Sequence, residues 1–141
     1  MMSRKTLVLV RHGQTLFNQK ERIQGWCDSP LTPLGLQQAK ETGLELKKRG
    51  YTFDAAYSSV SERAWRTLEE IYDGPYSLKR ELKEMNFGAL EGDPEDWYPD
   101  FDKREQLQVQ QGGESHEQVA DRTEQIVRQI MKQPGNSILI A

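Results

Sequence analysis

Short apolar runs with strand character alternate along this chain with longer segments of helical periodicity. Residues 6–10 (TLVLV) are almost entirely apolar and largely β-branched, which is typical of a strand covered on both faces. Residues 53–57 and 76–79 predict two further strands, and residues 138–141 begin a fourth. Helices between successive strands favour a mostly parallel sheet. We therefore predict an α/β fold with helices on both faces of the sheet, a three-layer sandwich, within one domain over residues 1–141.

Helix-capping residues predict where the first long helix begins and ends. Thr32 is a favourable N-cap, and Pro33 suits the first helical position. The helix is expected to run to about Arg49 and to stop at Gly50, because glycine readily adopts the backbone conformation that ends helices. A modest apolar stripe recurs at helical spacing through Leu36, Ala39, Gly43 and Leu46.

Two later segments have the spacing of a capping box, in which a serine and the residue three positions on satisfy each other's backbone groups. Ser59 with Glu62 predicts a helix to about Tyr72, and Ser115 with Gln118 predicts another. Residues 91–113 are rich in glycine, proline and polar side chains, so they are expected to form a loop with a short helix near residues 102–110. The buried face of the last helix is predicted to comprise Val119, Ile126, Val127, Ile130 and Met131.

Charge and composition limit the partners of this protein. A net charge of -3 argues against a nucleic-acid binder, which usually presents a basic surface. It does not argue against a small phosphorylated ligand, because a few arginines facing one cleft produce a local positive field. The apolar runs are far too short to cross a bilayer, and no secretory signal is recognisable. With a single cysteine, Cys27, we expect a cytoplasmic protein without membrane contact; the oligomeric state is left open, a homodimer included.

The residues that follow the predicted strands can support phosphoryl transfer. Arg11, His12 and Gly13 come directly after the first strand and combine a guanidinium, an imidazole and a glycine that allows close backbone approach. Arg63 lies in the first turn of the helix after the second strand, where the helix dipole favours an anion. Glu84 follows the third strand. Because the carboxyl ends of parallel strands share one edge of a sheet, these side chains are expected to converge.

None of these residues is specific by itself. A histidine after a strand is more often a surface residue than a nucleophile, and most glutamates are surface charges. His116, at the start of a predicted helix, is expected to be exposed and not catalytic. No G-x-G-x-x-G or Walker motif follows the first strand, which argues against a nucleotide-binding domain.

Several motifs, in order along the chain, resemble those of the histidine phosphatase (phosphoglycerate mutase-like) superfamily. Residues 9–15 (LVRHGQT) with Asn18 are similar to its RHG signature, and residues 24–32 (QGWCDSPLT) with Gly35 are similar to the segment that opens its first helix. The other matching segments are Ser58-Ser59 with Arg63, Ala64 and Thr67; Glu84 with Phe87, Gly88, Glu91 and Gly92; and the turn Gly112-Gly113-Glu114-Ser115.

This resemblance implies roles for the site residues. His12 would be the nucleophile that accepts the phosphoryl group, and Glu84 would be the general acid and base. Arg11 and Arg63 would clamp the phosphate oxygens. Further substrate-binding positions implied by the motifs are Asn18, Gly13, Thr15, Gln24 and Gly25. The expected partner is a small phosphorylated substrate; no cofactor is implied, and no metal, because arginines supply the positive charge.

Within the family, phosphatase and phosphoglycerate mutase are the two activities to distinguish. The mutases carry a longer basic insertion between the glutamate motif and the late helix. Residues 91–111 are short here, acidic at the start, and contain Arg104 as their only arginine, which favours a phosphomonoester hydrolase. The family also places a second histidine directly after the strand begun by residues 138–141. Its absence from the sequence predicts a domain that lacks the C-terminal part of the fold, and leaves a non-catalytic phosphate-binding domain as a third alternative.

Overall fold

Four parallel strands form the sheet at the centre of the structure, a computed structural model that describes residues 4–97 and 99–141. The strand order is β1-β4-β2-β3, and every pair of neighbours is parallel. The last strand in sequence therefore lies between the first two. The strands are β1 (Thr6–Leu9), β2 (Ala55–Ser58), β3 (Ser77–Leu78) and β4 (Ser137–Ile140).

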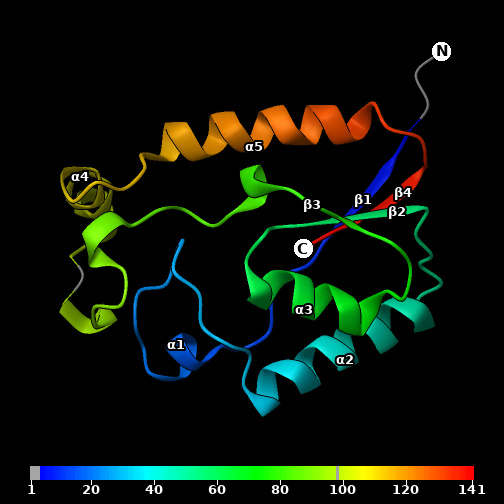
Figure 1. The fold of residues 1–141 in the computed structure, drawn as a ribbon, viewed down its shortest axis with the longest axis horizontal. Helices are drawn as coiled ribbons and strands as arrows, with labels where there is room; N and C mark the ends of the chain where they lie inside the picture. The colour runs from blue at the N-terminus through cyan, green and yellow to red at the C-terminus, as the bar shows by residue number, and fades with distance from the viewer. Residues whose placement is uncertain (1–3, 98) are drawn as a thin grey trace.

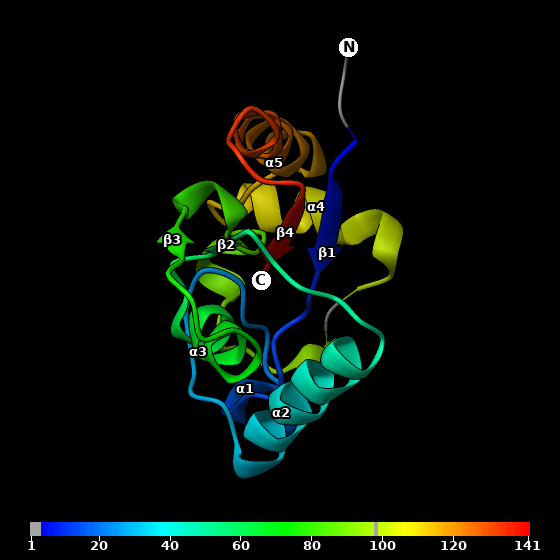
Figure 2. The ribbon, with the colours of Figure 1, turned by 90° about the vertical axis from the view of Figure 1, so that its right-hand side faces the viewer.

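Helices cover both faces of the sheet. Helix α5 lies across one face, and α2 and α3 lie together on the other (Figure 1, Figure 2). The prediction of a three-layer α/β sandwich with a parallel sheet is confirmed. The α-helices are α1 (Leu16–Gln19), α2 (Pro33–Lys48), α3 (Glu62–Ile71), α4 (Phe101–Gln110) and α5 (His116–Met131), and the 3-10 turns are η1 (Arg80–Leu82), η2 (Gly88–Leu90) and η3 (Glu95–Trp97).

Strand β4 supplies the centre of both apolar layers because successive side chains of a strand point to opposite faces. Ile138 and Ile140 pack with Ile126 and Ile130 on the face covered by α5. Leu139 packs with Ala56 and Leu68 on the face covered by α3. The two clusters hold the carboxyl ends of the strands in register.

Strand β1 agrees only in part with its prediction. Leu7 and Val8 pack against the clusters on opposite faces of the sheet, but the strand lies at an edge and its last residue, Leu9, is 72% exposed. An edge position cannot be read from an apolar run, because the run looks the same whichever neighbours the tertiary fold provides.

Two of the predicted helix starts are confirmed at the atomic level. The hydroxyl of Thr32 accepts from the Gly35 amide, and Pro33 begins α2. Ser115 and Gln118 form the complete capping box of α5. Gly50 follows α2 with a φ of 84°, the left-handed conformation that favours glycine. The short helix expected near residues 102–110 is α4.

Other local predictions were wrong. Ser59 and Glu62 do not form a capping box: α3 begins at Glu62 after Ser61, and the Ser61 side chain makes no capping bond. The four-residue helix α1, within residues 11–30, was not predicted. In α5, Met131 is 40% exposed and not part of the buried face, where Ile126 and Ile130 lie.

Candidate functional site

The predicted site residues meet at the carboxyl edge of the sheet. Arg11, His12, Arg63 and Glu84 line one cavity of about 440 Å³. The same four residues line a neighbouring cavity of about 430 Å³, which also contacts Ala141 beyond the end of β4. The structure therefore brings together one imidazole, two guanidinium groups and one carboxylate from three separate segments.

His12 is held as a neutral ring with a defined tautomer. Its Nδ1 lies 2.7 Å from the carbonyl oxygen of Gly13. Because a carbonyl only accepts, Nδ1 carries the proton and the lone pair is on Nε2. Burial lowers the pKa of His12; the nearby charges of Arg63 and Arg11 lower it further, while the Gly13 bond and Glu84 act in the opposite direction. A neutral imidazole with a free Nε2 is the form that can attack phosphorus.

The two arginines are held differently. Arg63 is 3% exposed, and its guanidinium donates to the carbonyl oxygens of Gly25 and Cys27 and to the carboxylate of Asp28. Three of the five donors are used in this way, which leaves two for a ligand. Arg11 is exposed, and no hydrogen bond or ion pair engages its guanidinium within the part of the chain that the structure describes. Arg63 is thus held in place by protein contacts, whereas the guanidinium of Arg11 is exposed to solvent.

Asp28 fixes the start of the helix that carries Arg63. Its Oδ2 accepts from the amide of Glu62 at 2.6 Å, and its Oδ1 accepts from Arg63 at 3.1 Å. Asp28 therefore performs the capping function that Ser61 leaves unfilled, from 34 residues away in the sequence. The same carboxylate orients the arginine and neutralises part of its charge.

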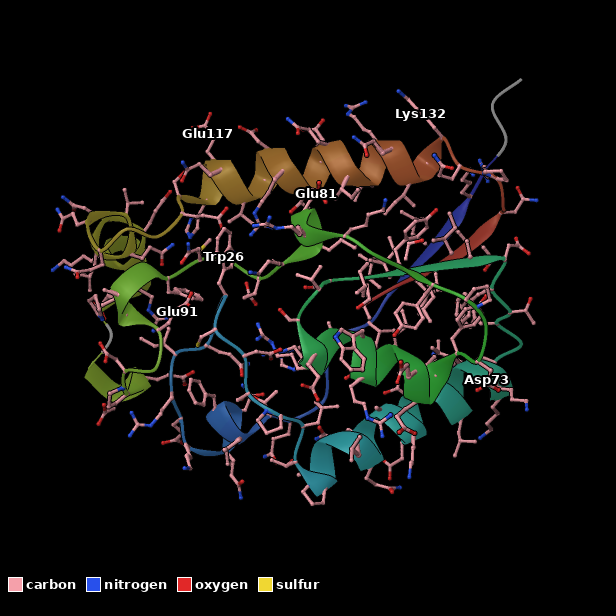
Figure 3. All side chains as sticks on the ribbon, viewed as in Figure 1. Trp26, Asp73, Glu81, Glu91, Glu117 and Lys132 are labelled. Atoms are coloured by element: carbon pink, nitrogen blue, oxygen red, sulfur yellow. The ribbon has the colours of Figure 1, made fainter. Side chains whose placement is uncertain are left out.

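Glu91 holds the loop of residues 24–29 against the rest of the site. Its carboxylate accepts from the backbone amides of Trp26, Cys27 and Phe87, at 2.8, 2.6 and 3.0 Å. Trp26 and Glu91 lie side by side at this end of the molecule in Figure 3. Gly25 has a φ of 81°, and a Cβ there would lie 2.5 Å from the Glu91 carboxylate, so the loop passes too close for a larger residue.

The remaining predicted substrate-binding residues divide into two groups. Asn18, Gln24 and Gly25 line the cavity. Thr15 is fully buried, and its hydroxyl accepts from the backbone amide of Asn18 and donates to Oε1 of Gln24. Thr15 therefore lies behind the cavity wall, where it supports Asn18 and Gln24, and its direct contact with substrate stays a prediction.

Gly13 also lies outside the cavity lining. A Cβ on Gly13 would lie 2.2 Å from the Gly35 carbonyl oxygen, so this glycine is required by the contact between the β1 end and the start of α2. Its contribution to the site comes through its carbonyl, which orients His12.

Sequence reasoning missed several residues on the cavity wall, of which three are basic. Arg22, Arg104 and His116 line the same cavity as His12. Arg22 donates to the Gly92 carbonyl at 2.7 Å, and His116 lies 3.3 Å from the Glu105 carboxylate. His116 was expected to be exposed, and its side chain is 46% exposed. Its place on the cavity wall comes with the bonds that join it to Glu105 of α4, which no local pattern predicts.

Two other chemistries have little support in this site. Burial raises the pKa of the Cys27 thiol, and the charge of Glu91 raises it further, so this thiol is poorly activated as a nucleophile. Among the described residues no group of three or more histidine, cysteine or acidic side chains is arranged to hold a metal ion. The described residues also contain no helix with the length and apolar character needed to span a bilayer.

The fold and the site define an α/β protein with a cavity at the carboxyl edge of a parallel sheet, lined by a neutral imidazole and by guanidinium groups. The model of the histidine phosphatase superfamily (branch 1) matches residues 7–141. The chain therefore belongs to this family, as the motifs indicated.

Solved structures of family members match the fold closely. A phosphoglycerate mutase from Bacillus anthracis has a TM-score of 0.84 and 27% identity, with 97% of this chain and 74% of that chain covered. YhfR from Bacillus stearothermophilus has a TM-score of 0.84 and 34% identity, covering 96% and 72%. A mycobacterial glucosyl-3-phosphoglycerate phosphatase, solved with VO3, has a TM-score of 0.80 and 26% identity, covering 96% and 74%.

Proposed function

We propose that this chain is a phosphomonoester hydrolase that acts on a small phosphorylated metabolite through a phosphohistidine at His12. The observation that carries the proposal is the state of His12: a neutral ring, protonated on Nδ1, lining a cavity with two arginines and a glutamate. The family membership supports it, since two of the matching proteins named above are a phosphatase and a mutase.

In the first step, Nε2 of His12 forms a bond to phosphorus as the bond between phosphorus and the leaving oxygen breaks. The electron pair of that bond passes to the leaving oxygen, which takes a proton from Glu84. Arg11 and Arg63 stabilise the negative charge on the phosphoryl oxygens, and removing one such donor typically costs roughly 10²–10³ in turnover.

In the second step, water attacks phosphorus and its proton passes to Glu84. The bond from Nε2 to phosphorus breaks, its electron pair returns to the ring, and phosphate is released. The position directly after β4, where the family resemblance places a second histidine, opens onto the cavity that Ala141 and His12 share. A donor there would act on the same phosphoryl oxygens.

The test is to incubate the protein with p-nitrophenyl phosphate, measure phosphate release and trap the phosphoenzyme under alkaline conditions. We expect a phosphohistidine at His12 that is absent in H12A. Intact folding of H12A is checked by its circular dichroism. Turnover that survives H12A would reject the mechanism, and a wild-type chain that binds phosphate without turnover would favour the non-catalytic alternative.

A phosphoglycerate mutase is the second candidate. Arg22 and Arg104 line the cavity in addition to the phosphate-clamping pair, so a second anionic group on the substrate has partners there. The short segment that contains Arg104 favours the hydrolase. Incubation with 3-phosphoglycerate and bisphosphoglycerate distinguishes the two, because mutase turnover faster than hydrolysis would reverse the preference.

A further inference from the structure

Arg122, on α5, is joined to the backbone of Glu84 and of the residues that precede it. Its guanidinium donates to three backbone carbonyl oxygens, those of Glu81, Lys83 and Glu84, at 2.8, 2.7 and 2.9 Å. It also makes a two-point contact with the carboxylate of Glu114, at 2.8 and 2.9 Å. Five hydrogen bonds equal the full donor capacity of an arginine, so this side chain has no donor left for substrate.

The segment that carries Glu84 needs such support. It lies between the 3-10 turns η1 and η2, where no helix or strand ladder satisfies its backbone carbonyls. Helix α5 packs on η1, and Figure 3 shows Glu81 directly beneath that helix. Arg122 therefore links a rigid helix to an irregular segment whose backbone sets the direction of the Glu84 side chain.

Glu114 completes the link from the other side. Its Oε1 also accepts from the amide of Asn86 at 2.8 Å, two residues beyond Glu84. The bonds from Arg122 lower the pKa of Glu114, so the pair is ionised at neutral pH. Both side chains are mostly buried, at 17% and 15% exposed, which protects the pair from solvent screening.

From this geometry we propose that Arg122, with Glu114, is a positioning residue for Glu84 in the proposed phosphatase reaction. The inference rests on the proposed function for the role of Glu84. The planar guanidinium of Arg122 donates to three carbonyls and a carboxylate at the same time. A lysine ammonium has its three donors on one atom and cannot reach all of these acceptors.

The test uses the leaving group. An alkyl phosphate needs a proton on its departing oxygen, whereas the p-nitrophenolate of an aryl phosphate departs without one, and acid catalysis is typically worth about 10²–10⁴-fold. We expect R122K to lower kcat/KM for β-glycerol phosphate by roughly 10²-fold and to change kcat/KM for p-nitrophenyl phosphate only a few-fold. The matched control is R128K on the same helix, where Arg128 is exposed and, among the described residues, pairs with Glu124 alone.

Two further measurements distinguish a positioning role for Arg122 from a general loss of folded structure. In an E84Q background, R122K should cause little additional loss on β-glycerol phosphate, because the group it positions is already gone. Amide exchange at Met85 and Asn86 should quicken at least about tenfold in R122K and stay unchanged in R128K, since Arg122 holds the segment whose amides bond to Glu84 and Glu114.

Equal losses on both esters, an undiminished effect in E84Q, or unchanged exchange at Met85 and Asn86 would each overturn the inference. A wild-type chain without turnover on either ester would instead refute the proposed function. In that case the exchange measurement alone still decides whether Arg122 orders the Glu84 segment.

Discussion

Replacing Asp28 by alanine tests whether a side chain distant in sequence caps α3 and holds Arg63. In the structure the Asp28 carboxylate accepts from the Glu62 amide at 2.6 Å and from Arg63 at 3.1 Å. The D28A variant removes both contacts. The D28N variant keeps an oxygen that can cap the helix, because asparagine and aspartate are comparable N-caps, but it loses the negative charge beside Arg63.

The two contacts have different expected magnitudes. Loss of an N-cap costs about 1 kcal/mol. A hydrogen bond to a charged group is worth about 1.5–3 kcal/mol, and the lower end applies because the Asp28 side chain is 31% exposed and Arg63 keeps two carbonyl acceptors. We therefore expect D28A to lower the free energy of unfolding by about 2–3 kcal/mol and D28N to lower it by about 1–1.5 kcal/mol.

Urea unfolding followed by far-ultraviolet circular dichroism measures these differences. The control is D73N, which removes a charge at the opposite end of α3, where Asp73 is exposed and far from Trp26 and Glu91 (Figure 3). If D28A is no less stable than D73N, Asp28 does not cap α3. If D28A and D28N are equally destabilised, the cap contributes nothing and only the charge pair matters.

Three other changes have defined outcomes. Because the pKa of His12 is lowered, its ring stays neutral below the ordinary histidine value of about 6.5. The midpoint of its NMR titration should therefore lie below about 6.5, and the phosphorylation rate should fall only as pH drops through that midpoint. A midpoint at or above about 6.5 would contradict the neutral assignment. G13A should lower the free energy of unfolding by more than about 2 kcal/mol, because its Cβ meets the Gly35 carbonyl. G50A strains the backbone at a positive φ but adds its Cβ in open space, so it should lower the free energy of unfolding by about 1 kcal/mol. Equal losses in urea unfolding would refute the steric argument. L68A truncates a fully buried side chain and should lower the free energy of unfolding by about 2–5 kcal/mol in the same assay. A loss under about 1 kcal/mol would mean that the core around Leu68 closes over the space left by the missing atoms.

The pH dependence of His12 also affects stability, with a definite sign. Because the folded-state pKa is lowered, the unfolded chain binds the proton more tightly. The stability associated with this ring is therefore present above the unfolded pKa of about 6.5 and is lost as pH falls through the lowered folded value.

The class of fold could be predicted, and so could the convergence of four candidate side chains, because both depend on local patterns. The alternation of apolar runs and helical segments indicates a parallel sheet, and residues that follow parallel strands must share an edge. Arg11, His12, Arg63 and Glu84 line one cavity, as this reasoning predicts. Thr32 and Ser115 were correct as helix starts, since each cap bonds to an amide three residues on.

The failures share a cause that is not local. Ser59 has capping spacing with Glu62, yet Asp28 takes the capping position because the 24–29 loop packs against the start of α3. Leu9 lies on a strand that the topology leaves at the edge of the sheet. His116 reaches the cavity wall through the placement of α5.

The sequence by itself thus determined the order of strands and helices, most of their ends and the chemical groups at the strand ends, because periodicity and capping act over about four residues. The tertiary structure decided how those groups are oriented. The carbonyl that fixes the tautomer of His12 belongs to the next residue, but the other partners are distant in sequence: Arg63 is held by the carboxylate of Asp28, and the carbonyl of Glu84 accepts from the guanidinium of Arg122. Such partners are specified by the packing of the whole chain, since each bond requires two backbones to be placed to within a fraction of an ångström.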